Sequence, residues 1–161
     1  MSDQPVKEVT FEREYDAPIE KVWRAWTDAE QLKKWWGPDN VTIPECEIDL
    51  RVGGRLYIVM EADESMGELK GTRWPMEATF TVVEEPSKLS YDAKAWTTGD
   101  EEATTIQTTT DIAFSEENGK TKLVLTAAIQ AAGPRAGMAV EGMKYGYSQQ
   151  FDKLTYFLAA S

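Results

Sequence analysis

The chain has 161 residues, with 28 acidic and 17 basic side chains, a formal charge of −11 and no histidine. This length and an apolar content of 42% favour a single globular domain over residues 1–161. The absence of histidine excludes imidazole bases and His-ligated zinc, and the single Cys46 excludes an internal disulfide and thiolate-rich metal sites. The acidic balance disfavours nucleic acid as a partner, because phosphates would be repelled.

The first part of the chain predicts a strand followed by two short helices. Residues 9–15 alternate between apolar and polar side chains, as in a strand. Pro18 suits the first turn of a helix, and apolar residues follow at helical spacing over 19–26. Asp28 resembles the start of a capping box, and the second helix is expected to end at Gly37-Pro38.

The rest of the chain predicts six more strands and one long helix. Residues 41–130 contain apolar segments separated by turns, of which Gly53-Gly54 and Asn118-Gly119 indicate tight hairpins. A helix over 136–158 follows, with apolar residues three or four apart. Successive hairpins form an antiparallel sheet, so the expected fold class is α+β. The sheet has seven strands, with the two short helices between strands 1 and 2.

Glycines in the last helix raise the question of a cavity. A curved sheet and a straight helix leave space between them where side chains do not meet. Gly137, Gly142 and Gly146 occupy helical positions at which each costs roughly 1 kcal/mol relative to Ala. Two interpretations stay open: the glycines allow close contact between helix and sheet, or they widen a cavity.

Several short motifs together resemble one bacterial protein family. They are Asp16-Ala17-Pro18, Val22-Trp23, Ala25-Trp26, Trp35-Trp36-Gly37-Pro38, the segment from Asp49 to Arg55, and Glu141-Gly142-Met143. They resemble bacterial homologues of the activator of the 90-kDa heat-shock protein ATPase, a family of the START/polyketide-cyclase (SRPBCC) superfamily. The resemblance covers residues 9–158. It implies a helix-grip fold, also called birch-pollen-allergen-like, in which a curved sheet wraps around the last helix and an apolar or amphipathic molecule binds between them.

Aromatic and methionine side chains are the main candidates for ligand contact, because they suit irregular apolar molecules. Arg13 is in register with Phe11 and Tyr15, so strict alternation turns its guanidinium inward. There it would anchor an anion or form a structural ion pair. The expected ligand-binding residues are Arg13, Tyr57, Trp74, Met76, Tyr91, Trp96, Met138, Met143 and Tyr147.

Other conspicuous residues receive a structural interpretation. Four tryptophans of the short helices are expected to pack this helix pair against the sheet and the last helix: Trp23, Trp26, Trp35 and Trp36. Gly53-Gly54 joins two strands and opens no helix, so it is no phosphate-binding loop, and we expect no cofactor.

Carboxylates are the remaining route to acid–base catalysis in a chain without histidine. Glu77 lies in the middle of a predicted strand, and an inward side chain would have a pKa raised towards that of a general acid. The neighbouring pattern favours an outward side chain. Cys46 alternates with core positions and has no base available, so we expect an inert thiol. We therefore assign neither a catalytic residue nor a metal site.

Binding of a small hydrophobic or amphipathic molecule between sheet and last helix is therefore the expected function. A cyclase- or hydrolase-like enzyme with a cavity carboxylate is the second hypothesis, and a chaperone-interacting stress-response protein is the third. The third is not favoured, because the resemblance covers one domain only of the eukaryotic co-chaperones. Residues 1–9 lack the core of a signal peptide, and no apolar run approaches the roughly 18 residues that span a bilayer. We expect a cytoplasmic protein without membrane insertion, and a homodimer is left open.

Overall fold

The computed structural model describes residues 7–134 and 136–160, and only the backbone of residues 138–142. Within these ranges, seven strands form one sheet in the order β1-β7-β6-β5-β4-β3-β2, and every neighbouring pair is antiparallel. The elements are β1 (Lys7–Tyr15), α1 (Ile19–Thr27), α2 (Ala29–Trp35), β2 (Val41–Ile48), β3 (Arg55–Ala62), the 3-10 helix η1 (Glu64–Leu69), β4 (Arg73–Glu84), β5 (Lys88–Ala95), α3 (Glu101–Thr104), β6 (Ile106–Glu117), β7 (Lys120–Ala132) and α4 (Gly137–Ala160).

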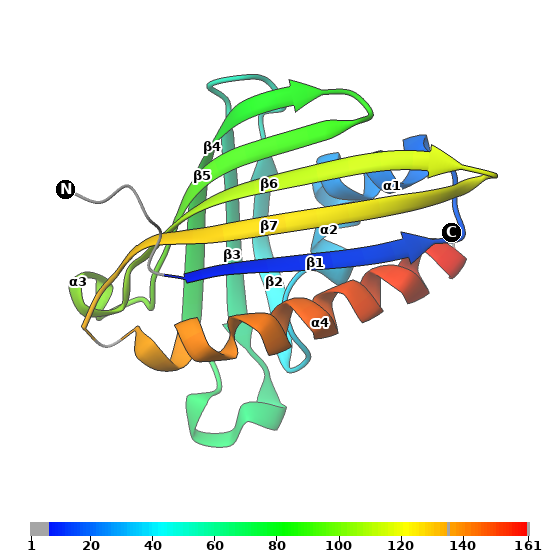
Figure 1. Ribbon diagram of the computed structural model, residues 1–161. Coiled ribbons are helices and arrows are strands. Elements are labelled where there is room, and N and C mark those ends of the chain that lie inside the picture. Colours follow the sequence, from blue (N-terminus) through cyan, green and yellow to red (C-terminus); the bar gives the residue numbers. More distant parts are fainter. Residues whose placement is uncertain (1–6, 135, 161) are drawn as a thin grey trace.

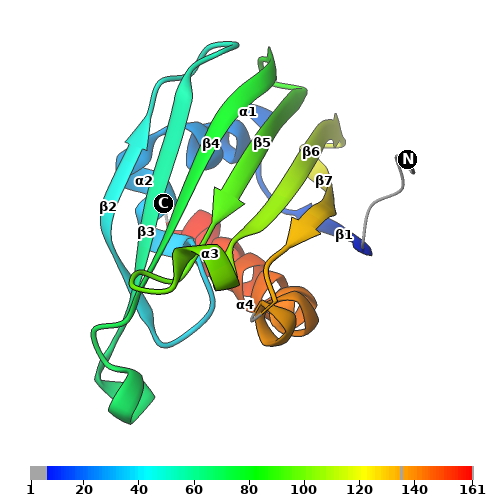
Figure 2. The same cartoon turned by 90° about the vertical axis from the view of Figure 1, so that its left-hand side faces the viewer.

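This order confirms the predicted α+β fold of a curved antiparallel sheet and a long last helix (Figure 1). Strands β2 to β7 follow one another as neighbours, and β1 pairs with β7 at the far edge. Helices α1 and α2 carry the chain from one edge of the sheet to the other. Figure 2 shows the sheet curving around α4, which lies on its concave side.

Local differences from the sequence prediction are small and fall in two predicted loops and at the start of α2. Residues expected to form loops contain a 3-10 helix, η1, and the short helix α3. The Asp28 carboxylate caps α2 by accepting the Glu30 N–H at 2.9 Å, one residue earlier than a capping box would have it. Among the described residues, no helix combines the length and apolar character that a membrane crossing requires.

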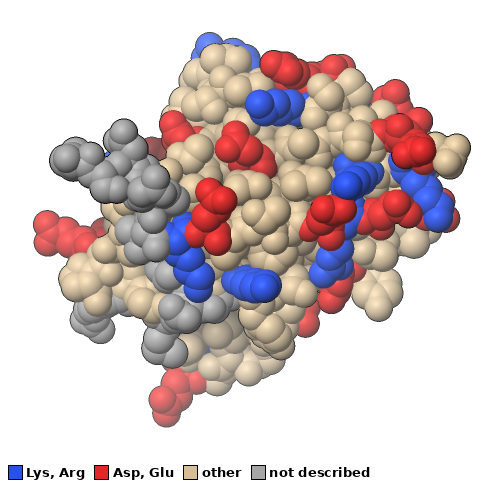
Figure 3. All heavy atoms as spheres, viewed as in Figure 1, with Lys and Arg blue, Asp and Glu red and all other residues tan. Residues whose placement is uncertain are grey.

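Charged side chains of both signs lie on the exterior, where some of them form ion pairs. Cross-strand ion pairs join Glu12 to Lys122 at 2.9 Å and Glu14 to Lys120 at 3.8 Å. On the face drawn in Figure 3, acidic and basic side chains are interspersed. Exposed pairs of this kind contribute little to stability, so the fold depends on its apolar interior.

An aromatic cluster joins the short helices to α4 and the sheet. The Trp26 ring lies 4.8 Å from that of Trp35, 5.9 Å from that of Trp36 and 6.4 Å from that of Phe151 on α4. Trp23 packs edge-on against Phe114 of β6 at 5.5 Å. The predicted packing role of these tryptophans therefore agrees with their contacts.

Replacing Trp35 by alanine tests the weight of this cluster. The side chain is completely buried, and its Nε1 donates to the Ala25 carbonyl at 3.1 Å. We expect Trp35→Ala to lower the free energy of unfolding by about 3–5 kcal/mol, because it leaves a large cavity. Tyr156→Ala, at a side chain 76% exposed, should change it by less than about 0.5 kcal/mol. Equal losses in urea unfolding would contradict the central role of Trp35.

Candidate functional site

A cavity of about 180 Å³ lies between the sheet and α4. Its walls come from β3, β4, β5 and β6, from α4, and from residues 36–38 between α2 and β2. Among the described residues that line it, none is Asp, Glu, Lys or Arg. The cavity is thus a neutral, mainly apolar space inside a strongly acidic protein.

Strand alternation builds the sheet wall of the cavity. Ile58 and Met60 on β3, and Trp74 and Met76 on β4, lie two residues apart and so point to the same face. In the antiparallel register Met60 faces Trp74 and Ile58 faces Met76. Two thioethers and an indole therefore lie together, a combination that adapts to apolar molecules of irregular shape.

Four residues of α4 form the opposite wall. Met143, Gly146, Tyr147 and Gln150 follow at positions i, i+3, i+4 and i+7, which places them on one side of the helix. A Cβ built on Gly146 would meet nothing within 4 Å. Close contact between helix and sheet therefore does not explain Gly146, and its widening of the cavity does. Gly142 lies outside the residues whose side chains are described.

Residues 36–39 close one side of the cavity and are fixed to α4 by four hydrogen bonds, which we call the clasp. Gln150 Oε1 accepts the Gly37 N–H at 2.9 Å, and Gln149 Oε1 accepts the Asp39 N–H at 3.0 Å. Lys153 Nζ donates to the Trp36 and Pro38 carbonyls, each at 3.2 Å. Burial lowers the pKa of Lys153, while the nearby Asp39 raises it.

Two phenols lie close to the cavity: the half-buried Tyr147 on α4, which lines it, and the fully buried Tyr91 on β5, which does not. Burial raises the pKa of Tyr147 to about 12, against the opposing effect of the Thr110 hydroxyl. Burial also raises the pKa of Tyr91 well above its usual value, with a further rise from Tyr147 and an opposing effect of Thr110. Both phenols therefore stay protonated and neutral near pH 7.

The structure brings four of the predicted ligand-binding residues together at the cavity. Trp74, Met76, Met143 and Tyr147 all line it. Tyr91 is fully buried and packs edge-on against Phe80 at 6.2 Å, beside the cavity wall and not in it. The Met138 side chain lies outside the described residues.

Three other candidates lie away from the cavity. Tyr57 lies on the face of the sheet turned away from α4, where the Arg55 guanidinium carbon is 4.3 Å from the centroid of the Tyr57 ring. Trp96 follows β5, where its backbone N–H donates to the Pro75 carbonyl, and it is not among the residues that line the cavity. The Arg13 guanidinium binds Asp152 at 2.8 Å and Ser148 at 3.3 Å, both on α4. Of the two interpretations of Arg13, an anion anchor and a structural ion pair, these contacts match the ion pair.

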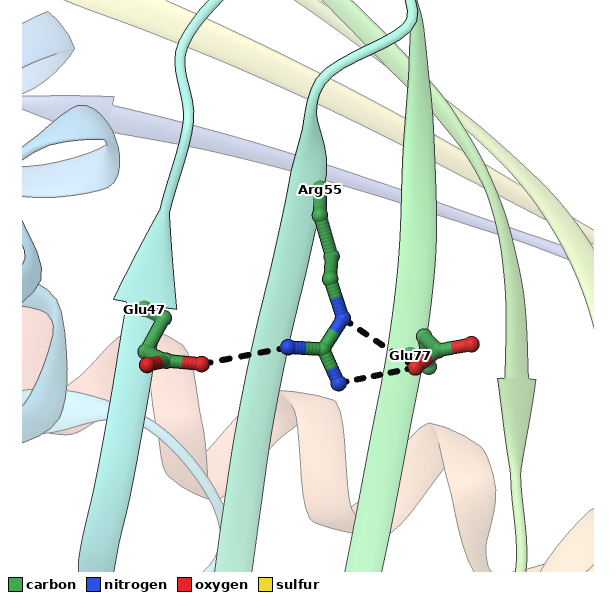
Figure 4. Close-up of polar contacts among 3 residues, drawn as sticks. All are labelled: Glu47, Arg55 and Glu77. Atoms are coloured by element: carbon green, nitrogen blue, oxygen red, sulfur yellow. Dashed lines mark hydrogen bonds and ion pairs between the residues drawn. The ribbon is translucent and has the colours of Figure 1, made fainter.

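Glu77, the strongest candidate for a catalytic acid, points away from the cavity. Arg55 Nη2 and Nε donate to Glu77 Oε2 at 2.8 and 3.1 Å, and Arg55 Nη1 reaches Glu47 Oε2 at 3.1 Å (Figure 4). The Glu77 side chain is 53% exposed. The enzyme hypothesis therefore loses the carboxylate on which it depended. The described residues also contain no cluster of three side chains able to hold a metal ion.

Sequence reasoning missed several cavity residues, including Trp36, Met60 and Gln150. Gln150 had a usable signal, since it lies three residues after Tyr147 and seven after Met143 on a helix. Met60 lies two residues after Ile58 on a strand that is apolar on both faces, so alternation alone did not identify its side. Trp36 both packs in the aromatic cluster and lines the cavity.

Comparisons with known proteins agree with this architecture. The family model described as Activator of Hsp90 ATPase homolog 1-like protein matches residues 16–159. The search of curated proteins gave no match. A crystal structure of a Nitrosomonas europaea protein is 24% identical, with a TM-score of 0.76 over 99% of this chain and 97% of that chain. A Rhodobacter sphaeroides protein is 22% identical, with a TM-score of 0.75 over 99% of this chain and 96% of that chain. A protein named AHSA1 from Silicibacter pomeroyi is 21% identical, with a TM-score of 0.72 over 96% of this chain and 99% of that chain. At these identities the likeness shows the fold alone.

Gly37→Ala tests how tightly the clasp segment is packed. Gly37 has a φ of +84°, and an added Cβ would lie 2.9 Å from Val41 Cγ2 and 3.0 Å from Met60 Sδ. Gly53 has a φ of +83° with nothing within 4 Å, so Gly53→Ala measures the backbone penalty alone, about 1 kcal/mol. We expect Gly37→Ala to be less stable than Gly53→Ala by about a further 1 kcal/mol or more in chemical unfolding. Equal losses of unfolding free energy in the two variants would show that residues 36–39 can move to accommodate the added methyl group.

Alkylation tests the inert thiol expected at Cys46. Burial raises the pKa of Cys46 to about 11, although Lys33 opposes the rise. Only the thiolate reacts, so iodoacetamide should alkylate the native protein at pH 8 roughly 100-fold more slowly than the chain unfolded in urea. The native rate should climb with pH up to about 11. Similar rates in the two states at pH 8 would contradict this expectation.

Proposed function

Because this chain belongs to the Activator of Hsp90 ATPase homolog 1-like family, we propose that it binds a small apolar or amphipathic molecule in the cavity between the sheet and α4. The observation that carries the proposal is an open apolar space which Gly146 keeps free of side chains. A pocket of this kind, apolar with few polar groups, is the usual form of a small-molecule site.

The size of the cavity limits the molecule that it can hold. An engineered cavity of about 150 Å³ in another protein accommodates benzene. A volume of about 180 Å³ thus suits a single ring with a short substituent, unless side chains move. For a molecule of this size, dissociation constants of about 0.01 to 1 mM are expected, because few atoms contribute contacts.

The alternatives receive less support from the described residues. An enzyme acting through a cavity carboxylate lacks that carboxylate, since Glu77 is on the outer face. A chaperone-interacting role and a homodimer have no specific observation in their favour, and we propose neither. The unpaired Cys46 suits a reducing compartment, and we propose a cytoplasmic location on this ground.

Binding of isopropylbenzene to two glycine variants of α4 tests the proposal. Gly146 lines the cavity and Gly137 does not, and an added Cβ would meet nothing within 4 Å at either position. Both Gly146→Leu and Gly137→Leu gain helix propensity, but only the first fills the cavity. In titration calorimetry we expect the native protein and Gly137→Leu to bind isopropylbenzene. Gly146→Leu should weaken binding at least tenfold.

The same pair of variants separates this result from general changes in stability. A ligand that binds the folded state raises Tm with its concentration, so near-saturating isopropylbenzene should raise the Tm of the native protein and of Gly137→Leu. The Tm of Gly146→Leu should not respond. Lack of binding to the native protein would overturn the proposed function, and equal binding to all three proteins would place the ligand elsewhere.

A further inference from the structure

The side-chain amino group of Gln150 is a buried hydrogen-bond donor at the cavity. Gln150 is only 4% exposed and lies on the α4 side that lines the cavity. Its Nε2 has no hydrogen-bond partner among the described residues. Leaving such a group unpaired costs about 1–3 kcal/mol, and buried polar groups in folded proteins are normally satisfied.

The clasp fixes which end of the Gln150 amide is the donor. The Gly37 N–H can only donate, and it does so to Gln150 Oε1 at 2.9 Å. Exchanging the oxygen and the nitrogen would place two donors against each other. The amino group must therefore lie on the side of the amide away from Gly37, with two N–H bonds to offer.

The charge around the cavity restricts what this donor can meet. No described residue that lines the cavity is cationic, and Lys153 is engaged with the Trp36 and Pro38 carbonyls. The Arg13 guanidinium is bound to Asp152. A carboxylate in this space would lose its hydration without gaining a counter-ion, which is strongly unfavourable. A neutral acceptor, such as a carbonyl oxygen, carries no such penalty.

We propose that Gln150 Nε2 donates a hydrogen bond to the ligand, and that the cavity thereby selects neutral, ring-sized molecules with a carbonyl oxygen over hydrocarbons of the same size. This inference rests on the proposed function and specifies its ligand class. Tyr147 lies three residues earlier on the same side of α4, and its phenol, which also interacts with the Thr110 hydroxyl, is a second donor at the cavity. A carbonyl oxygen has two lone pairs and can accept from both.

Acetophenone and isopropylbenzene test this selection, because each is a phenyl ring with a branched substituent of three non-hydrogen atoms and only acetophenone has a carbonyl oxygen. Their affinities differ also through their hydration in water, and comparing variants cancels that contribution. Gln150→Met keeps the length of the side chain and removes the donor. We expect the ratio of the acetophenone to the isopropylbenzene dissociation constant, measured by calorimetry, to rise about tenfold in Gln150→Met relative to the native protein.

Gln149→Met is the matched control for loss of the clasp. Gln149 accepts the Asp39 N–H from the same segment that Gln150 holds, but it does not line the cavity. Both variants therefore lose one hydrogen bond between α4 and residues 36–39. The ratio of dissociation constants should remain unchanged in Gln149→Met. An equal rise in both variants would assign the effect to loosening of the clasp and overturn the inference.

An infrared measurement on the native protein keeps the test independent of variant folding. Hydrogen bonding lowers the carbonyl stretching frequency, so bound ¹³C-labelled acetophenone should absorb at a lower frequency than in hexane. An unshifted band, or an unchanged ratio in Gln150→Met, would overturn the inference while isopropylbenzene binding still upheld the proposed function. Benzoate should not bind, and tight benzoate binding would overturn the preference for neutral molecules. If the native protein bound neither acetophenone nor isopropylbenzene, both proposals would fail.

Discussion

The position of α4 against the aromatic cluster is the constraint on which the rest of the structure depends. Phe151 packs against Trp26 at 6.4 Å and against Phe11 of β1 at 5.6 Å, and Leu154 and Leu158 further along the helix are buried. This half of α4 is thus fixed on the sheet edge and the short helices. A straight helix held in this way cannot follow the curvature of the sheet, so one side of the segment from Met143 to Gln150 lines the cavity.

Polar chemistry is divided between two sides of the sheet. The outer face carries charged networks such as Glu47–Arg55–Glu77, whose members are well exposed. The cavity between the inner face and α4 holds neutral donors and acceptors, including the Tyr147 phenol and the Gln150 amide of α4. Burial suppresses ionisation inside, as the raised pKa of Tyr147 indicates. The division explains why a chain with a net charge of −11 has an uncharged cavity among its described residues.

Much of the fold could be predicted from the sequence, but the predicted ligand-binding residues include only four of the fifteen described residues that line the cavity. Alternation and turn signals located the strands, because a half-buried strand must expose every second residue. Tyr57 was misplaced because β3 is apolar on both faces, so alternation did not show which side faces α4. Ala93 and Ala95 gave no signal, since small side chains mark a cavity only once their neighbours are known. The clasp joins residues more than one hundred positions apart, which local patterns do not register.

Gln150 belongs to the clasp and to the cavity wall at once, and this double membership has a thermodynamic consequence. In the proposed complex, a single conformation of the Gln150 side chain accepts the Gly37 N–H through its oxygen and donates to the ligand through its nitrogen. Such linkage is reciprocal. A bound molecule that stabilises this conformation of Gln150 also stabilises the contact of residues 36–39 with α4. That contact in turn strengthens binding of the molecule. Occupancy of the interior and order of the segment beside it are therefore coupled through one amide, with no larger rearrangement of the sheet.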